Sequence, residues 1–218
     1  MFFNGTLYVI TDQQLSSPRS NREVITQALA GGATAVQLRE KALPERQLWQ
    51  QAVELREITA RAGAAFIIND RVDLALAVDA DGVHLGQDDL PAEVARKLLG
   101  PGKILGISVT SVAEALAAQA AGADYLGVGP IYPTTTKSDA RDIVGLAGLK
   151  EIRQVVSLPL IAIGGINLTN IREVISAGAD GIAVVSAIVT APDIAKTTQE
   201  MLTEILHRSR MYETARNW

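Results

Sequence analysis

Two aspartates, Asp70 and Asp89, each follow an apolar stretch of the chain, and a short helix-like run separates them. Their separation is about the length of one strand–helix repeat, so in a parallel β/α architecture they lie at the same end of neighbouring strands. Carboxylate oxygens in this arrangement suit Mg²⁺, which commonly takes one or two protein carboxylates and completes its shell with water and substrate phosphates. The two residues therefore predict a magnesium site.

Two cations support that interpretation, although each aspartate also has a simpler one. Arg39 and Lys41 follow another apolar stretch, where an arginine could bind a phosphate bidentately and a lysine could act as a point charge. The alternative is a solvated loop with an Arg–Glu surface pair for the cations, and helix N-caps for Asp70 and Asp89. Taken together, the four residues favour a Mg²⁺–diphosphate site over two separate caps.

A repeated pattern in the chain predicts the elements that must position these side chains. In each repeat a helix ends at Gly or Ala-Gly-Ala, an apolar strand follows, and the strand closes on polar residues. Glycine is common at a helix C-terminus, and near-continuous apolar strands are typical of a parallel sheet buried on both faces. Eight strands are predicted, at 7–11, 35–38, 65–68, 82–85, 104–109, 125–129, 160–163 and 181–185.

Eight strand–helix repeats predict an α/β fold, a single (β/α)8 TIM barrel. We expect residues 1–218 to form one catalytic domain, with 208–218 as a peripheral tail. An open doubly wound sheet shows the same alternation of elements and is the rival architecture. The length of 218 residues fits the barrel, which usually needs roughly 200 to 250.

Helix starts are predicted near Pro44, at a Ser111–Glu114 capping box and at an Asn170–Glu173 pair. The last helix should bury one apolar stripe against the barrel. The members of that stripe are Ile194, Thr198, Met201, Leu202, Ile205 and Leu206.

Composition excludes several classes of protein. A net charge of −4 and a pI near 5.3 argue against a general nucleic-acid binder, which needs clustered Lys and Arg. The absence of cysteine excludes disulfides, thiolate metal sites and cysteine nucleophiles. No signal-like N-terminus or long apolar run appears, so no membrane association is expected. We expect a cytoplasmic enzyme that acts on small molecules and could form a homo-oligomer.

In such a barrel the active site lies at the C-terminal ends of the strands, where further polar residues collect. Ser108 ends the fifth strand and is either a ligand donor or an ordinary turn serine. The sixth strand leads into 129–137, a long segment with three threonines and Lys137 that is typical of a substrate-covering loop. These residues extend the predicted site around the barrel mouth.

The seventh and eighth strands exit at 164–166 and 185–186, the usual phosphate-binding corner of this fold. The alternative is a pair of tight turns in which glycine serves geometry alone. His84 is interpreted as a hydrogen-bonded core histidine and His207 as a surface residue. Two anion pockets are therefore predicted, one metal-assisted and one metal-free, which would fit two phosphorylated substrates.

Six short motifs, in order along nearly the whole chain, resemble those of the thiamine-phosphate synthase family. They are Tyr8-Val-Ile-Thr-Asp12, Gln37-Leu-Arg-Glu-Lys41, Ile68-Asn-Asp-Arg-Val-Asp73, Gly82-Val-His-Leu-Gly-Gln87, Gly129-Pro-Ile-Tyr-Pro-Thr-Thr-Thr-Lys137 and Gly164-Gly-Ile166. The resemblance implies that a hydroxymethylpyrimidine diphosphate joins a thiazole phosphate to give thiamine phosphate. Pyrophosphate would be released, together with carbon dioxide when the thiazole is carboxylated.

The resemblance also implies which residues bind each substrate. Those for the pyrimidine diphosphate are Gln37, Leu38, Arg39, Glu40, Lys41, Asn69, Ser108 and Lys137. Those for the thiazole phosphate are Thr134, Thr135, Thr136, Gly165, Val185 and Ser186. Asp70 and Asp89 would bind Mg²⁺, and the catalytic residues would be Arg39, Lys41, Ser108 and Lys137.

The implied mechanism is dissociative. Mg²⁺ and the cationic side chains would stabilise charge on the departing pyrophosphate, while the electron-rich pyrimidine carries the resulting cation. Three alternatives remain at the level of sequence: a thiazole tautomerase on the same barrel, a Schiff-base aldolase using Lys137, and a non-catalytic sensor of phosphorylated ligands. Retention of Arg39, Lys41, Asn69, Asp70 and Asp89 argues against the tautomerase.

Overall fold

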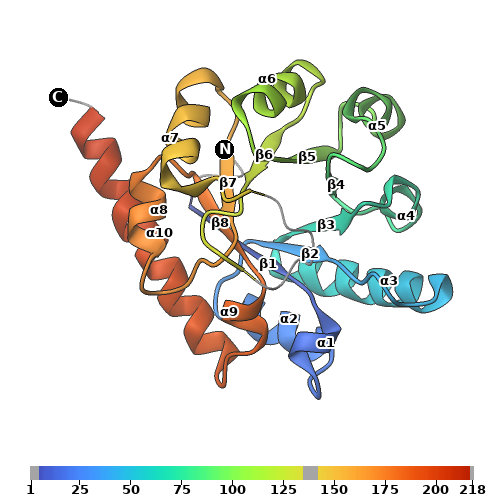
Figure 1. Ribbon diagram of the computed structural model, residues 1–218. Coiled ribbons are helices and arrows are strands. Elements are labelled where there is room, and N and C mark those ends of the chain that lie inside the picture. Colours follow the sequence, from blue (N-terminus) through green and yellow to red (C-terminus); the bar gives the residue numbers. More distant parts are fainter. Residues whose placement is uncertain (1–4, 135–141, 217–218) are drawn as a thin grey trace.

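Eight parallel strands close into a barrel in the computed structural model, which describes residues 5–134 and 142–216 and the side chains up to 207 (Figure 1). The strands pair in sequence order, and β8 pairs with β1 to complete the ring. They are β1 Thr6–Ile10, β2 Ala35–Leu38, β3 Ala65–Asn69, β4 Gly82–Leu85, β5 Ile104–Val109, β6 Tyr125–Val128, β7 Leu160–Ile163 and β8 Gly181–Val184. The predicted (β/α)8 barrel is confirmed, and the open sheet is excluded.

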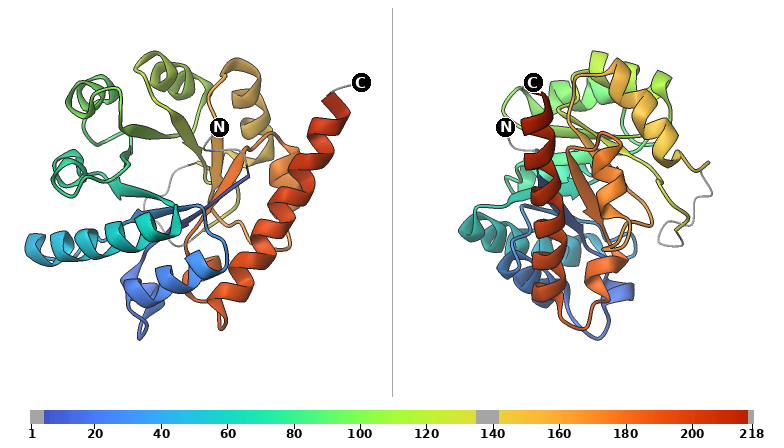
Figure 2. Two further views of the ribbon diagram at one scale, coloured as in Figure 1. Left: turned by 180° about the vertical axis from the view of Figure 1, so that it is seen from behind. Right: turned by 90° about the vertical axis from the view of Figure 1, so that its left-hand side faces the viewer.

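Helices surround the strands on the outside of the barrel (Figures 1 and 2). They are α1 Gln13–Ser16, α2 Asn21–Ala30, α3 Glu45–Ala62, α4 Val72–Ala77, α5 Ala92–Leu99, α6 Val112–Ala120, α7 Gly145–Val155, α8 Ile171–Ser176, α9 Ser186–Val189 and α10 Ile194–Arg216. Four predicted strands match those observed, three differ by one residue at one end, and the first is shifted by one residue at both ends. Among the described residues, no helix combines the length and apolar character needed to cross a membrane.

Apolar residues fill both faces of the barrel wall, which explains the near-continuous apolar strands. The larger core lies between strands and helices, and a smaller one fills the barrel interior. Along β1, Leu7 and Val9 belong to the outer core, whereas Tyr8 and Ile10 belong to the inner one. Side chains therefore fill the barrel interior, and in this fold the active site lies at the C-terminal ends of the strands.

The helix starts correct two details of the sequence analysis. Ser111 caps α6 by accepting the Glu114 N–H at 3.2 Å, but the Glu114 carboxylate accepts the Thr110 N–H, so the box is only half formed. Asn170 is the N-cap of α8, which confirms the predicted helix start, but its side chain makes no cap hydrogen bond. The complete capping box is at Ser20, before α2, where the sequence analysis did not predict one.

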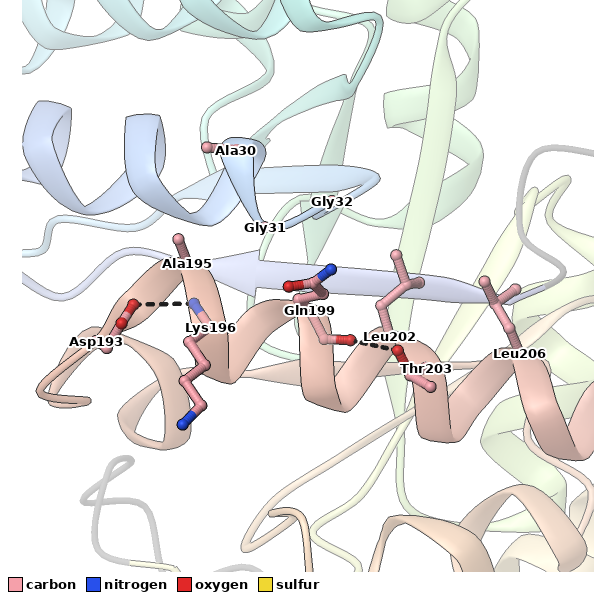
Figure 3. Close-up of a pocket in the computed structure, with 10 residues that line it drawn as sticks. All are labelled: Ala30, Gly31, Gly32, Asp193, Ala195, Lys196, Gln199, Leu202, Thr203 and Leu206. Atoms are coloured by element: carbon pink, nitrogen blue, oxygen red, sulfur yellow. Dashed lines mark hydrogen bonds between the residues drawn. The ribbon is translucent and has the colours of Figure 1, made fainter.

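The inner stripe of α10 is confirmed in part. Ile194, Met201 and Ile205 are fully buried, and α10 packs against α2 and α8 (Figure 2). Leu206, by contrast, is 40% exposed, so its predicted burial is wrong. Figure 3 shows the reason: Leu206 and Leu202 line an open groove beside the turn that follows α2, on the outside of the barrel.

Three Arg–Asp clamps stabilise the N-terminal face of the barrel. In each, an aspartate just before an even-numbered strand accepts an N–H near the start of the previous strand and pairs with an arginine from a preceding helix. They are Asp81 with Phe66 and Arg56, Asp124 with Leu105 and Arg96, and Asp180 with Leu160 and Arg153. Thr34 makes the equivalent bond to Leu7 without an arginine. This face therefore supports stability rather than chemistry.

Arg96→Met is expected to lower the free energy of unfolding by about 2 kcal/mol and to leave turnover unchanged. Besides its 2.5 Å contact with Asp124, Arg96 donates to three backbone carbonyls, which would lose these bonds. Chemical denaturation measures the change. The control is Arg22→Met, which removes an exposed ion pair with Glu54 and should cost less than about 0.5 kcal/mol. Equal losses for the two variants would contradict the assignment.

Candidate active site

The exit of β2 is held rigidly by its neighbour β1. Buried Thr11 follows β1, and its hydroxyl accepts the Arg39 N–H at 2.9 Å and donates to the Arg39 carbonyl at 3.4 Å. Arg39 is half-buried and Lys41 is exposed, and both charges act on Asp70 at the exit of β3. The two hydrogen bonds from Thr11 therefore hold the backbone from which the Arg39 side chain extends.

Asp70 and Asp89 lie together at the exits of β3 and β4, as the sequence predicts. Asp70 adopts a left-handed backbone with φ of 63°, and its N–H donates to the His84 carbonyl at 2.9 Å. Asp89 accepts the Gly86 N–H at 2.6 Å. A non-glycine residue in this conformation is uncommon and is often associated with a functional position.

Electrostatics connect this carboxylate pair to the two cations. Burial, together with the hydrogen bond and the negative charge of Asp89, raises the pKa of Asp70 to about 6. The positive charges of Lys41 and, to a smaller extent, Arg39 lower the pKa of the same carboxyl. All four groups are thus close enough to interact, and the repulsion between the carboxylates would be relieved by a bound cation.

Neither aspartate is a helix cap, which removes the simpler interpretation. The N-cap of α4 is Arg71 and that of α5 is Pro91, and both lack a side-chain cap bond. Within 5–134 and 142–207, no group of three or more His, Cys, Asp or Glu side chains could hold a metal. Two carboxylates suit Mg²⁺, which usually draws its remaining ligands from water and substrate phosphates.

The neighbours of Arg39 have structural partners of their own. The Glu40 carboxylate accepts the Gln13 N–H at 3.1 Å and the Asn21 amide at 2.7 Å, and burial raises its pKa. Its side chain thus braces the loop against α1 and α2. Leu38 is 2% exposed in the outer core, so only its backbone is placed to contact a ligand.

A hydrogen-bonded chain crosses the barrel interior between two predicted ligand contacts. It starts at Gln37 on β2 and passes through Tyr8, Tyr125 and His84 to Ser108 on β5. Asn69, also predicted to bind ligand, ends β3 beside His84 in the register of the sheet. The prediction that His84 is hydrogen-bonded inside the barrel is confirmed, and His207 is exposed as expected.

The exits of β6 and β7 are joined by backbone hydrogen bonds. Ile131 donates to the Ile163 carbonyl at 2.9 Å, and Tyr132 donates to the Gly164 carbonyl at 3.0 Å. Gly165 has φ of 65° and lies so close to Tyr132 and Pro133 that a Cβ would clash with both. The glycine turn is therefore next to the start of the 129–137 loop. Thr134 is exposed, whereas Thr135, Thr136 and Lys137 lie outside the described residues.

The exit of β8 leads directly into the short helix α9. Val185 is its N-cap and Ser186, its first residue, is exposed. Arg19 donates to the carbonyls of Ala191 at 2.6 Å and Val189 at 3.0 Å, and so holds the far end of α9. Helix α1 packs beside it (Figure 1). The predicted phosphate corner thus has a braced backbone.

Residue types alone did not reveal Arg19, Tyr8 or Tyr125 as parts of this architecture. Two glycines could have pointed to the interior rings. A Cβ on Gly106 would lie 2.1 Å from Tyr125 Cζ, and one on Gly127 would lie 2.8 Å from His84 Cε1. Glycine within a strand often marks a close approach by a neighbouring group.

Together, the closed barrel and its polar strand exits define a (β/α)8-barrel protein whose candidate site, with a carboxylate pair beside two cations, is suited to phosphorylated ligands. Comparison with known proteins makes the assignment specific. The family model described as thiamine monophosphate synthase matches residues 7–188. The chain belongs to this family, whose members are transferases.

Individual relatives agree over nearly their whole length. Thiamine-phosphate synthase of Chloroflexus aurantiacus is 58% identical over 195 residues, covering 89% of this chain and 90% of the relative. The enzyme of that name from Moorella thermoacetica is 53% identical over 204 residues, covering 94% and 97%. Among solved structures, thiamine phosphate pyrophosphorylase from Pyrococcus furiosus matches with a TM-score of 0.88 and 47% identity, covering 95% and 98% of the two chains.

Proposed function

We propose that this protein condenses 4-amino-2-methyl-5-(diphosphooxymethyl)pyrimidine with a thiazole phosphate, giving thiamine phosphate and pyrophosphate. Carbon dioxide would also leave when the thiazole carries a carboxylate. The observation that carries the proposal is the Asp70 carboxyl, which interacts electrostatically with Asp89 and with the two cations Lys41 and Arg39. Family membership adds weight, because the relatives bear the name of this activity.

The pyrimidine diphosphate would bind on the side of β2 to β5. Arg39 and Lys41 would bind the diphosphate, the first bidentately and the second as a point charge. Gln37, Asn69 and Ser108 would contact the same substrate, together with the backbone around Leu38 and Glu40. Lys137 would approach from the loop after β6, as the resemblance implies.

Asp70 and Asp89 would hold Mg²⁺, and their arrangement fits that ion. When bound, Mg²⁺ supplies positive charge that stabilises a leaving pyrophosphate. The positive side chains of Arg39 and Lys41 would also stabilise the leaving pyrophosphate, because negative charge grows on it as the carbon–oxygen bond breaks. No general base is required, since the thiazole nitrogen attacks with its own lone pair.

The thiazole phosphate would bind at the exits of β6, β7 and β8. Gly165, Val185 and Ser186 would offer backbone N–H groups without a charged side chain. Thr134, Thr135 and Thr136 would close the pocket from the opposite side. The backbone link between the loop after β6 and the glycine turn supports this arrangement.

The direct test is turnover with purified protein. Incubation with both substrates and Mg²⁺ should yield thiamine phosphate, and EDTA should stop the reaction. No product under varied conditions would refute the synthase. Conversion of a thiazole tautomer in the absence of the pyrimidine would instead indicate a tautomerase, and a borohydride-trapped adduct on Lys137 would indicate an aldolase.

Protonation of Asp70 is expected to weaken Mg²⁺ binding below about pH 6. Its pKa of about 6 means that in acid a proton occupies the carboxyl that the cation needs. Because this folded-state pKa is raised, the carboxyl's own contribution to stability is largest in acid and is lost as the pH rises through about 6. A bound cation offsets that loss. The rise in thermal midpoint on adding Mg²⁺ should therefore be larger near pH 7.5 than near pH 5, and the reverse order would contradict the assignment.

A further inference from the structure

Five side chains form a continuous hydrogen-bonded chain across the inside of the barrel. Gln37 Nε2 lies 2.9 Å from Tyr8 Oη, which lies 3.2 Å from Tyr125 Oη. His84 Nδ1 lies 2.8 Å from Tyr125 Oη, and His84 Nε2 lies 2.8 Å from Ser108 Oγ. Both ends of the chain are residues expected to contact the pyrimidine diphosphate, whereas the three central groups are not.

Donor and acceptor chemistry gives this chain a direction. An amide nitrogen can only donate, so Tyr8 accepts from Gln37. Among the described residues Tyr125 is the one acceptor beside the buried Tyr8 hydroxyl, and the Tyr8 proton is satisfied when Tyr8 donates to Tyr125. Burial raises the pKa of both phenols far above their usual range, so both keep their protons at neutral pH. The Tyr125 proton is then available to His84 Nδ1.

A neutral imidazole that accepts at one nitrogen must donate at the other. With Nδ1 accepting from Tyr125, His84 carries its proton on Nε2 and donates it to Ser108 Oγ. Ser108 has a single hydroxyl proton, and its bond with His84 would then leave that proton for another acceptor. Since Ser108 is half-exposed near the end of β5, that acceptor can be a ligand in the barrel mouth.

We infer that His84 is a positioning residue: Tyr125 holds it in the Nε2–H tautomer, and it thereby makes the Ser108 hydroxyl a hydrogen-bond donor to the pyrimidine diphosphate. The inference concerns the substrate side and so builds on the proposed function, but the tautomer itself can be measured without turnover. The barrel interior has room for these two rings because glycines, which lack a side chain, face them: Gly106 faces Tyr125 and Gly127 faces His84.

The tautomer can be read by NMR on protein labelled with ¹⁵N-histidine. The chain has two histidines, and His207→Gln removes the other signal, so the assignment is direct. We expect a protonated Nε2 and an unprotonated Nδ1 for His84. Tyr125→Phe keeps the ring but removes the hydroxyl, and it should shift the Nδ1 resonance. A wild-type Nδ1–H tautomer would overturn the inference, because Ser108 would then donate to His84 and not to a ligand.

Kinetics test whether His84 acts through Ser108. His84→Met should raise KM for the pyrimidine diphosphate about tenfold and leave KM for the thiazole phosphate within about twofold. His84→Gln places an amide donor near the position of Nε2 and should recover most of the loss. In a Ser108→Ala background, His84→Met should change kcat/KM less than about twofold. Equal effects on both substrates, or additive effects of the two substitutions, would show a merely structural role.

Discussion

Asp70→Asn is expected to lower Mg²⁺-dependent turnover at least about a hundredfold while the barrel remains folded. The substitution removes one of the two carboxylates and halves the formal negative charge that would hold the cation. Asn tolerates the left-handed backbone that Asp70 adopts, with φ of 63°, so the local conformation should survive. The experiment compares thiamine phosphate formation across a Mg²⁺ titration and checks folding by thermal melting.

A matched control is available within the same chain. Asp79 is the other non-glycine residue with a left-handed backbone among those described, with φ of 51°. It pairs with Lys103 and lies before β4, at the end of the barrel opposite the proposed site. Asp79→Asn should therefore keep wild-type turnover and Mg²⁺ dependence. Full activity of Asp70→Asn would show that the metal assignment is wrong.

Arg39→Met is expected to lower kcat/KM for the pyrimidine diphosphate by about 10²- to 10³-fold. The guanidinium would bind the diphosphate as its negative charge grows, so its loss affects the transition state more than the bound substrate. Thr11 bonds to both the N–H and the carbonyl of Arg39, so the backbone at this position should be unchanged in the variant. Initial rates at varied substrate concentration separate kcat from KM.

Two further variants make this result specific to Arg39. Arg39→Lys should recover only part of the activity, because an ammonium group cannot bind a phosphate bidentately. Arg46→Met removes an exposed arginine from the first turn of α3 and should change nothing. A loss below about threefold for Arg39→Met would place the diphosphate elsewhere.

Sequence periodicity predicted the strands to within one residue because both faces of each strand are buried. A strand such as β5, with apolar residues on either side, needs no knowledge of its partners to be recognised. Helix caps were less predictable. The Glu114 carboxylate could satisfy either of two adjacent N–H groups, and the structure shows that it bonds to Thr110. That choice depends on loop geometry, which the local pattern does not contain.

Some features of the candidate site could likewise be predicted from the sequence, whereas others required the structure. Asp70 and Asp89 could be predicted as neighbours, because the order of strands in a barrel brings consecutive exits together. Whether they were helix caps could not be decided from sequence, since Asp suits both roles. The structure answers this, because α4 and α5 begin beyond them without a side-chain cap.

The barrel, its polar strand exits and the family could be predicted from residue order, because they depend on periodicity and on short motifs that are local in the chain. Which polar groups contact one another became known from the folded structure. Tyr8 and Tyr125 are 117 positions apart, yet their hydroxyls are 3.2 Å apart inside the barrel. The physical reason is that closure of the sheet turns alternate residues of every strand toward one axis, and buried polar groups there must satisfy one another.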